Sequence, residues 1–388
     1  MTALTRRQLL LGGGALLGSG LLPGFGATLF SPAVGLINSA YADAIPRPDY
    51  LIRAGTNENP WGPSRVALQA INASMELSNQ YGGIGDEMRA LLGQINDVPA
   101  DHIAIGSGSG EILKVAGLLA SMTSGSIVCA DPTYQDLVRY AARAGTEIIR
   151  VPVDSESLVM DLDAMASAIR ADTRLVYIVN PNNPIPSVIK KNRLRDFVLE
   201  VSRDRMVFID EAYHEFVDNP GYGSMMELVR DGHRNIIVSR TASKIHGLAG
   251  LRVGFGFAHP DLIKAIDDKK TGQLNILGMK AAYASYQDEE FQRFTLRKNR
   301  ESLAIVEAML DDIGARYVRS NANFVFFETG YDVELVNELM LEQGVHVGRP
   351  FPPFLKWSRV SMAKPDEMRY VVAAYRRILP ALAERQAA

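Results

Sequence analysis

The chain has 388 residues, 47% of them hydrophobic and 22% charged, which is an ordinary globular composition with enough apolar material for a core. That length predicts one large domain and one smaller domain. The formal net charge is −3, and no long run of like charges interrupts the sequence. A nucleic-acid-binding surface needs a basic surplus, so we expect no nucleic acid among the partners.

The first 42 residues differ in composition from the rest of the chain. They contain no acidic residue, their only charges are Arg6 and Arg7, and an apolar segment rich in glycine and leucine precedes an Ala-Tyr-Ala motif that ends at Ala42. This pattern resembles a bacterial twin-arginine signal. The resemblance implies export by the twin-arginine machinery to the periplasm and cleavage after Ala42, which would change the net charge to −3 − 2 = −5. An uncleaved membrane anchor over residues 9–30 is the alternative, although its glycines and its proline weaken it as a permanent helix.

Cysteine usage fits the export of a folded protein. The sequence has a single cysteine, Cys129, within an apolar run, so no intrachain disulfide can form. The predicted route resembles a carrier of folded, cofactor-loaded proteins. Such a chain needs no disulfides formed after export.

Two segments near the amino terminus have the form of turns that precede helices. Residues 57–64 read Asn-Glu-Asn-Pro-Trp-Gly-Pro-Ser and end in a serine suited to cap a helix. Residues 102–121 read as strand, glycine-rich turn and helix. The amide groups of Ser109, Gly110 and Glu111 would open that helix, and a helix start presents unpaired donors and partial positive charge to an anion. This predicts a phosphate-binding turn, although glycine turns before helices are common in ordinary structure as well.

Strands and helices alternate between residues 126 and 209. This pattern predicts an α/β fold with a mostly parallel sheet and helices on both faces. Open sheets of this kind bind ligands at the carboxyl ends of their strands, where an aromatic ring can lie over a flat heteroaromatic cofactor. Tyr134 follows the expected strand at 126–130 and is the stacking candidate. A tyrosine that only caps a core helix is the alternative.

The segment 238–256 reads as a strand, a loop interrupted by glycines and a second strand, which places Lys244 on the loop. Hydroxyl groups precede the lysine at Thr241 and Ser243, and Arg252 follows it. An amine that can condense with an aldehyde, beside hydroxyls and a guanidinium that can hold a phosphate, predicts a site for an aldehyde that carries a phosphate. A basic surface loop is the alternative.

Two further strand ends supply what the ring of a pyridoxal cofactor requires. A carboxylate at the pyridine nitrogen keeps that nitrogen protonated and makes the ring an electron sink, and Asp210 is the candidate. Donors near the phenolate oxygen of the ring would lower the energy of its charge, and Asn183 and Tyr213 fit this role. An acid that only caps a strand end is the alternative for Asp210. No metal site is predicted.

The pattern changes to an α+β arrangement after residue 275, which predicts a second, smaller domain. Arg359 lies within a short expected strand at 357–361. A buried guanidinium without a partner is costly, so we expect a substrate carboxylate to bind there, with a structural salt bridge as the alternative. Arg349 is a second candidate anion contact.

These motifs resemble one family, the class I and II pyridoxal-phosphate-dependent aminotransferases, and most closely the histidinol-phosphate aminotransferase branch. The resemblance spans about residues 50–380 and implies fold type I, as a homodimer with its active site near the subunit interface. The implied organisation is a segment at 43–75 that joins the small domain, a large cofactor-binding domain at 76–275 and a small domain at 276–388.

The resemblance also implies roles for single residues. Asn59 belongs to the amino-terminal lip of the family's active site and would contact the substrate. Tyr81 would reach the cofactor phosphate of the neighbouring subunit. The chain departs from the family pattern at 185–187, where Ile-Pro-Ser replaces the usual residues, and at Gly348, which precedes Arg349.

We therefore predict a pyridoxal-phosphate-dependent aminotransferase that moves an amino group between an amino acid or a related amine and a 2-oxo acid, with Lys244 as the catalytic residue. A histidinol-phosphate transaminase is an alternative, although an exported enzyme would not meet cytoplasmic intermediates. Racemases, decarboxylases and lyases of the same fold are further alternatives. A non-catalytic cofactor-binding protein would be expected to lack Lys244, Asp210 or Asn183, and all three are present.

Overall fold

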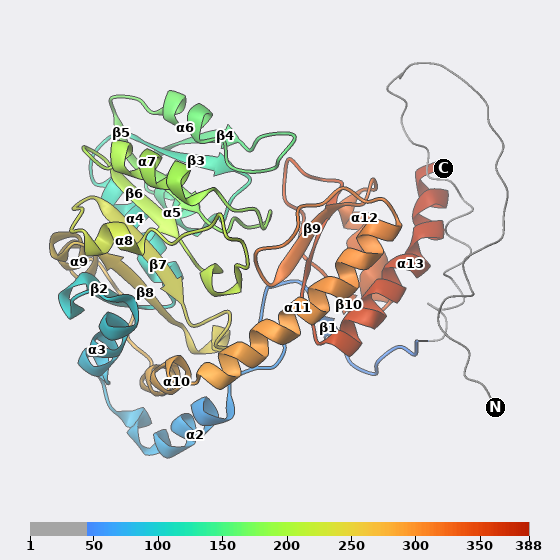
Figure 1. Cartoon of the computed structure of the whole chain (residues 1–388), viewed down its shortest axis with the longest axis horizontal. Helices are drawn as coiled ribbons and strands as arrows, with labels where there is room; N and C mark the ends of the chain where they lie inside the picture. Colours follow the sequence, from blue (N-terminus) through green and yellow to red (C-terminus); the bar gives the residue numbers. More distant parts are fainter. Residues whose placement is uncertain (1–44, 388) are drawn as a thin grey trace, which may run out of the picture.

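A computed structural model describes residues 45–387, which form two lobes connected by a long helix (Figure 1). The predicted export signal, its cleavage site after Ala42 and the alternative anchor at 9–30 lie outside the described residues. Within residues 45–387, no helix combines the length and the apolar composition needed to cross a membrane.

The large lobe is built on a seven-stranded sheet with the order β2-β8-β7-β6-β5-β3-β4. Strand β8 runs antiparallel to both of its neighbours, and the remaining neighbours pair in parallel. The predicted mostly parallel sheet is therefore confirmed. Its strands are β2 (Ile103–Ser107), β3 (Ser126–Asp131), β4 (Glu147–Pro152), β5 (Thr173–Val179), β6 (Met206–Asp210), β7 (Ile236–Thr241) and β8 (Val253–Ala258).

Helices surround this sheet in the large lobe (Figure 1). Helix α4 lies on β2 and β8 and contacts α5 and α9, whereas α6 contacts α7. The helices are α2 (Arg65–Ala73), α3 (Gly85–Asn96), α4 (Ser109–Ser121), α5 (Asp136–Arg143), α6 (Leu162–Ala168), α7 (Lys191–Val201), α8 (Met226–Arg230), α9 (Pro260–Asp267) and α10 (Ile276–Tyr286), with 3-10 turns η1 (Met75–Asn79), η2 (Ala100–His102), η3 (His214–Phe216) and η4 (Ala249–Leu251).

The small lobe contains two short sheets and three helices. Strand β1 pairs in parallel with β10, and β11 pairs antiparallel with β9, so the amino-terminal segment is part of this lobe. Helix α11 extends from the side of α10 to α13 (Figure 1). The elements are β1 (Ile52–Arg53), β9 (Phe324–Glu328), β10 (Val345–His346), β11 (Trp357–Ser361), α11 (Glu289–Asp312), α12 (Val333–Glu342) and α13 (Pro365–Ala387).

Each lobe has its own apolar core. The larger core gathers the buried side chains of the seven-stranded sheet and its helices, and the smaller one gathers β1, β9 and β11 with α11, α12 and α13. Met279, Ala281 and Ala282 of α10 belong to the larger core. The larger core therefore extends past the predicted boundary at residue 275, because α10 packs on α2 and β8 rather than on the small lobe.

Candidate active site

A cavity of about 310 Å³ lies at the carboxyl ends of β5, β6 and β7, where residues of the small lobe cover the sheet. It brings together twelve of the residues that the sequence predicts for the site. These are Ser109, Gly110, Tyr134, Asn183, Asp210, Tyr213, Thr241, Ser243, Lys244, Arg252, Arg349 and Arg359.

Lys244 lies on the loop between β7 and β8, as predicted. Its Nζ donates a hydrogen bond to the carbonyl oxygen of Asn57 at 3.2 Å and lies 5.5 Å from the centroid of the Tyr213 ring. The loop returns at Gly247, whose φ of 68° favours glycine and where a Cβ would lie only 2.1 Å from the carbonyl oxygen of Gly62. The lysine loop is therefore held directly against the 57–64 turn.

Asp210 ends β6 and is 2% exposed. Its Oδ1 accepts a hydrogen bond from the Ser239 hydroxyl at 2.9 Å. Burial raises the pKa of the Asp210 carboxyl from 3.8 to about 6, against the opposing effect of the Ser239 hydroxyl. Among the described residues no cation forms an ion pair with this carboxylate, so a cationic group in the cavity would favour its charged form.

The first turn of α4 also lines the cavity, through Ser109 and Gly110. Gly108 precedes the helix with a φ of 79°, and a Cβ there would lie 2.1 Å from a guanidinium nitrogen of Arg252. The amide groups of Ser109 and Gly110 stand in the first helical turn, where the helix itself offers them no acceptor. A helix start and a guanidinium side by side suit a phosphate group.

The hydroxyls of Thr241 and Ser243 are already ordered in this region. Thr241 Oγ1 donates to Ser243 Oγ at 2.9 Å and accepts from the Ser243 amide at 3.1 Å. The hydrogen of the Ser243 hydroxyl is therefore available to another acceptor. The donor set, the amine of Lys244 and the buried carboxylate of Asp210 together fit the phosphate, the aldehyde and the ring nitrogen of pyridoxal phosphate.

Two amides converge on Tyr213. Its oxygen accepts hydrogen bonds from Asn57 Nδ2 at 2.9 Å and from Asn183 Nδ2 at 3.3 Å. The Tyr213 ring packs edge-on against Phe324 of β9 with centroids 5.2 Å apart. The residue therefore joins the large lobe to the small lobe.

Arg359 lies within β11 and is 7% exposed. Its guanidinium donates to Asn183 Oδ1 at 2.7 Å and to the carbonyl oxygen of Gly55 at 2.5 Å, while its buried Nε has no partner among the described residues. Burial lowers the pKa of Arg359 to about 10, which leaves it charged at neutral pH. No described carboxylate pairs with it, so the structural salt bridge considered from sequence is absent from the described residues, and a buried positive charge faces the cavity.

Arg349 and Arg359 lie against the same aromatic ring. Their guanidinium carbons are 4.3 and 4.7 Å from the centroid of the Phe351 ring. Burial lowers the pKa of Arg349, and the charge of Arg139 lowers it further. The small-lobe side of the cavity thus presents two cationic groups around one ring.

The structure places Glu111, a predicted contact of the phosphate, outside the cavity. Its amide donates to the carbonyl oxygen of Gly108 at 3.1 Å, so it is not available to an anion. Its carboxylate accepts from the amides of Ser107 and Gly272 at 2.7 and 2.6 Å and does not line the cavity. The helix start and the acidic side chain are both used to fix the neighbouring loop.

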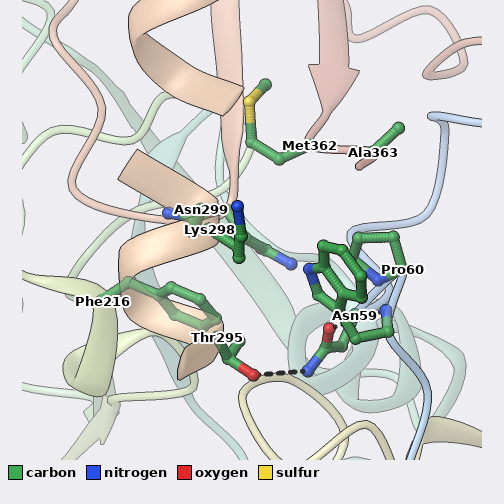
Figure 2. Close-up of a pocket in the computed structure, with 10 residues that line it drawn as sticks. Asn59, Pro60, Phe216, Thr295, Lys298, Asn299, Met362 and Ala363 are labelled. Carbon is green, nitrogen blue, oxygen red and sulfur yellow. Dashed lines mark hydrogen bonds between the residues drawn. The ribbon is translucent and has the colours of Figure 1, made fainter. Parts of the chain in front are cut away.

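The structure also places Asn59, the predicted substrate contact, away from the cavity. Asn59 does not line the Lys244 cavity but a separate pocket between the 57–64 turn and α11, where Figure 2 shows it facing Thr295. Its Nδ2 donates to the carbonyl oxygen of Ile245 at 2.8 Å, and its Oδ1 accepts from the Trp61 amide at 3.1 Å. Asn59 therefore supports the loop that carries Lys244.

Tyr81 does not reach the cavity of its own chain. It is 95% exposed, in the connection between η1 and α3. This position leaves its predicted contact with a neighbouring subunit untested.

The sequence argument did not name seven of the residues that line the cavity, and Asn57 and Phe351 are the two of them that contact other site residues most directly. Asn57 is the first residue of the 57–64 turn and is 1% exposed, with a left-handed φ of 55°. An asparagine tolerates that conformation better than most residues, but nothing local signals that its amide reaches Tyr213. Phe351 stands among prolines, and only the fold brings it between the two arginines.

The departure at 185–187 is accommodated by the small lobe. The carbonyl oxygen of Pro186 accepts from the amide and from Nδ2 of Asn321, both at 3.1 Å, and Ile185 is fully buried in the larger core. Asn183 therefore keeps its place in the cavity although the residues that follow differ from the family pattern.

Comparison with known proteins identifies this arrangement. Residues 51–374 match the family model described as aminotransferase class I and II. A histidinol-phosphate aminotransferase of Limosilactobacillus fermentum is 34% identical over 82% of this chain and 88% of its own length. Histidinol-phosphate aminotransferase 1 of Cupriavidus pinatubonensis is also 34% identical, over 85% of this chain and 88% of its own length.

Solved structures show the same fold. A structure described as a putative histidinol-phosphate aminotransferase from Erwinia carotovora atroseptica has a TM-score of 0.82 and 31% identity, and covers 87% of this chain and 99% of its own. The histidinol-phosphate aminotransferase of Sinorhizobium meliloti, solved with pyridoxal-5'-phosphate, has a TM-score of 0.78 and 24% identity over 92% and 96% of the two chains. The predicted fold type I is confirmed, and so is the pyridoxal phosphate cofactor that the cavity fits. The chain belongs to the class I and II aminotransferase family and is a pyridoxal-phosphate-dependent aminotransferase.

Proposed function

We propose that this aminotransferase takes its amino group from a donor with a carboxylate and a second anionic group, and that the reaction takes place in the Lys244 cavity. The observation that carries the proposal is the buried, charged guanidinium of Arg359, which has only neutral acceptors in the described chain. A carboxylate would supply the counter-charge and two oxygen acceptors.

In the proposed reaction, Lys244, Asp210 and Arg359 would each have a different role. Bound pyridoxal phosphate supplies an aldehyde and an electron-accepting ring. Lys244 would hold the aldehyde, and its amine would serve as the general acid and base that carries a proton to and from the reacting carbon of the substrate. Asp210 would keep the ring nitrogen protonated, and Arg359 would bind and orient the carboxylate of the substrate.

Arg349 supports the second anionic group. Its guanidinium lies 4.3 Å from the Phe351 ring and donates to the carbonyl oxygen of Pro350, with no ion pair among the described residues. Because Arg359 packs on the same ring, two anionic groups on one small molecule could meet both arginines. Dicarboxylic amino acids and amino acids that carry a phosphate belong to this class.

Histidinol phosphate is the second candidate substrate. The curated relatives at 34% identity are named for it, and its phosphate is an anion that the arginines could bind. The twin-arginine signal argues against it, because an exported enzyme would not meet this biosynthetic intermediate. We therefore favour an amino acid that carries a second anionic group.

A panel of amino donors tests this proposal. The purified enzyme is mixed with single donors in one half-reaction while the visible absorption of the cofactor is followed, using glutamate, aspartate, alanine, phosphoserine and histidinol phosphate. We expect the dianionic donors to react at least about tenfold faster than alanine and Arg349→Ala to remove most of that preference. Equal rates for alanine and the dianionic donors would contradict the proposal.

Related reactions are separated by product analysis. Formation of the 2-oxo acid indicates transamination, whereas loss of carbon dioxide, racemised amino acid or eliminated product indicates a decarboxylase, racemase or lyase of the same fold. We expect stoichiometric 2-oxo acid because Arg359 would bind the carboxylate and so protect it from loss.

We infer that the enzyme is exported to the periplasm by the twin-arginine machinery and cleaved after Ala42. The support is the Arg6-Arg7 pair, the apolar segment and the Ala-Tyr-Ala motif. Expression of the full chain, with and without Arg6→Lys/Arg7→Lys, tests it: the unchanged chain is expected in the periplasm with Asp43 at its amino terminus, and the variant in the cytoplasm.

We also propose a homodimer in which Tyr81 contributes to the partner's cofactor site. The support is the near-complete exposure of Tyr81 together with the exposed apolar side chains of Val66, Leu68 and Met75 in the neighbouring α2 and η1 region. Light scattering of the cofactor-loaded protein is expected to give twice the chain mass, and Tyr81→Phe is expected to weaken cofactor retention without changing that mass.

A further inference from the structure

The oxygen of Tyr213 accepts two hydrogen bonds, and the two donors come from different parts of the chain. Asn183 Nδ2 approaches at 3.3 Å from the end of β5, and Asn57 Nδ2 approaches at 2.9 Å from the amino-terminal turn. No described side chain accepts the hydrogen of the Tyr213 hydroxyl.

The orientation of both amides is fixed by their other contacts. The guanidinium of Arg359 has only donors, so the side-chain atom of Asn183 that faces it at 2.7 Å must be Oδ1, and Nδ2 must face Tyr213. The same logic applies to Asn57. Its backbone amide donates to Ser361 Oγ at 2.8 Å, which leaves the serine hydrogen to be donated to Asn57 Oδ1 at 2.7 Å.

We propose that Asn57 is a positioning residue that, together with Asn183, restricts Tyr213 to donating its hydroxyl hydrogen into the cavity. With two amide donors directed at its oxygen, the phenol has its own hydrogen left for another contact, and Tyr213 lines the cavity. The ring oxygen of pyridoxal phosphate is an acceptor of the kind that this hydrogen would need. The inference therefore rests on this cavity being the cofactor site.

The backbone of Asn57 acts on the second reactive group of the site. Its carbonyl oxygen accepts from Lys244 Nζ at 3.2 Å and from Asn323 Nδ2 at 3.1 Å. The left-handed φ of 55° is the conformation in which this residue makes its contacts to Tyr213, Lys244 and Ser361 at the same time. An asparagine adopts it at low cost, and a glycine would keep the backbone contacts while removing the amide.

The hydrogen bonds of Asn57 and Asn183 also connect strand β11 of the small lobe to the Tyr213 hydroxyl. Ser361 and Arg359 both belong to β11, and one holds Asn57 while the other holds Asn183. The direction of the Tyr213 hydroxyl therefore depends on the small-lobe strand through two separate amides.

Two variants distinguish the effect of the Asn57 side-chain amide from that of the Asn57 backbone. Asn57→Gly keeps the left-handed conformation and deletes the donor, and Asn57→Asp keeps the shape but replaces the donor with an acceptor. Asp97→Gly is the matched control, because Asp97 has a φ of 54° at the end of α3 and does not line the cavity. Each variant is also combined with Tyr213→Phe.

The first measurement needs no cofactor. In cofactor-free protein with 13Cζ-labelled tyrosine, the Tyr213 resonance is expected to move in Asn57→Gly and Asn57→Asp and to stay in Asp97→Gly. This readout reports the hydrogen bonds to the phenol oxygen, so it remains valid if the proposed substrate class is wrong. An unmoved resonance in both Asn57 variants would overturn the inference.

The second measurement uses the loaded enzyme. A weaker phenol donor leaves more negative charge on the oxygen that accepts its hydrogen, and that charge holds a nearby proton to higher pH. The visible-absorption titration is therefore expected to shift upward by about 1 pH unit in Asn57→Gly, with turnover about tenfold lower and the KM of the amino donor changed less than about threefold.

The double variants distinguish positioning from a general structural effect. If Asn57 acts through Tyr213, Asn57→Gly reduces the turnover of Tyr213→Phe by less than about twofold. A full tenfold loss in the Tyr213→Phe background, or an equal loss in Asp97→Gly, would overturn the inference. If Asn57→Gly does not fold, Asn57→Asp carries the same comparison.

Discussion

The two walls of the active-site cavity differ in how their charges are held. The cofactor wall, formed by Ser109, Asp210 and Lys244, comes from the large lobe, and its side chains stand directly after strands or at a helix start. The substrate wall, formed by Arg349, Phe351 and Arg359, comes from the small lobe, and its cations contact an aromatic ring and neutral acceptors. The strands and the start of α4 place the first wall within the large lobe, with the 57–64 turn against the lysine loop, whereas the second wall exists only when the two lobes are packed together.

This difference predicts that changes in the cofactor wall abolish the reaction for every donor, whereas changes in the substrate wall alter the choice of donor. In the proposed reaction, the cofactor wall would hold the group that reacts with all substrates. The substrate wall would contact only the parts of the substrate that differ from one donor to another.

The largest effect is expected for Lys244→Ala. Removing the only amine that lines the cavity should lower turnover at least about 10⁴-fold with every donor, because the covalent attachment and the proton carrier are both lost. Single-turnover absorption measurements check this, and Lys269→Ala, at an exposed position in the turn that follows α9, serves as the control. Undiminished turnover in Lys244→Ala would show that the assigned chemistry is wrong.

Asp210→Asn is expected to lower turnover about 10³-fold, because the ring nitrogen loses the charge that keeps it protonated. In contrast, Asp210→Asn should raise the free energy of unfolding of the cofactor-free protein at neutral pH. Because burial raises the pKa of the Asp210 carboxyl from 3.8 to about 6, folding disfavours its ionised form, and the contribution of this group to stability is lost as the pH rises through about 6.

The cofactor-free Asp210→Asn variant should therefore match the unchanged protein at pH 4 and exceed its free energy of unfolding at pH 7 by up to about 3 kcal/mol. Urea unfolding at the two pH values measures this difference. Added pyridoxal phosphate should reverse the order at pH 7, since only the carboxylate gains from a cationic ring. The same order with and without the cofactor would contradict the role of Asp210.

Arg359→Lys is expected to lower kcat/KM about 10²-fold for donors with a carboxylate. A lysine keeps the charge but loses the planar pair of donors and the contact with Phe351. Amines without a carboxylate should be affected less than about threefold, which separates a substrate contact from damage to the cofactor wall. An equal loss of kcat/KM for both kinds of donor would indicate that Arg359 maintains the structure of the site and does not bind the substrate carboxylate.

Asn59→Ala should have the smallest effect. The side chain holds the Ile245 carbonyl and the Trp61 amide rather than the substrate, so we expect a loss of about 1–2 kcal/mol in the free energy of unfolding. With saturating cofactor, kcat and KM should stay within about threefold for every donor. A large change in KM for one donor alone would instead support the prediction from sequence that Asn59 contacts the substrate.

The sequence by itself determined the parts of this protein that are encoded locally. Apolar runs and glycine turns predicted the parallel sheet, the loop of Lys244 and the start of α4, because strand ends and helix starts follow from neighbouring residues. Asp210 and Asn183 were found for the same reason, since each follows a readable strand.

The tertiary structure decided how the polar groups around those strands pair. Glu111 and Asn59 stand in the expected motifs, but long-range contacts with Gly272 and Ile245 use their hydrogen-bonding groups elsewhere. Asn57 contacts Tyr213 and Ser361, which lie 156 and 304 residues further along the chain, only when the chain is folded. Hydrogen bonds between distant segments leave no periodic trace in a sequence, so the packing of the two arginines on Phe351 and the link from β11 to the phenol of Tyr213 appear only in the folded chain.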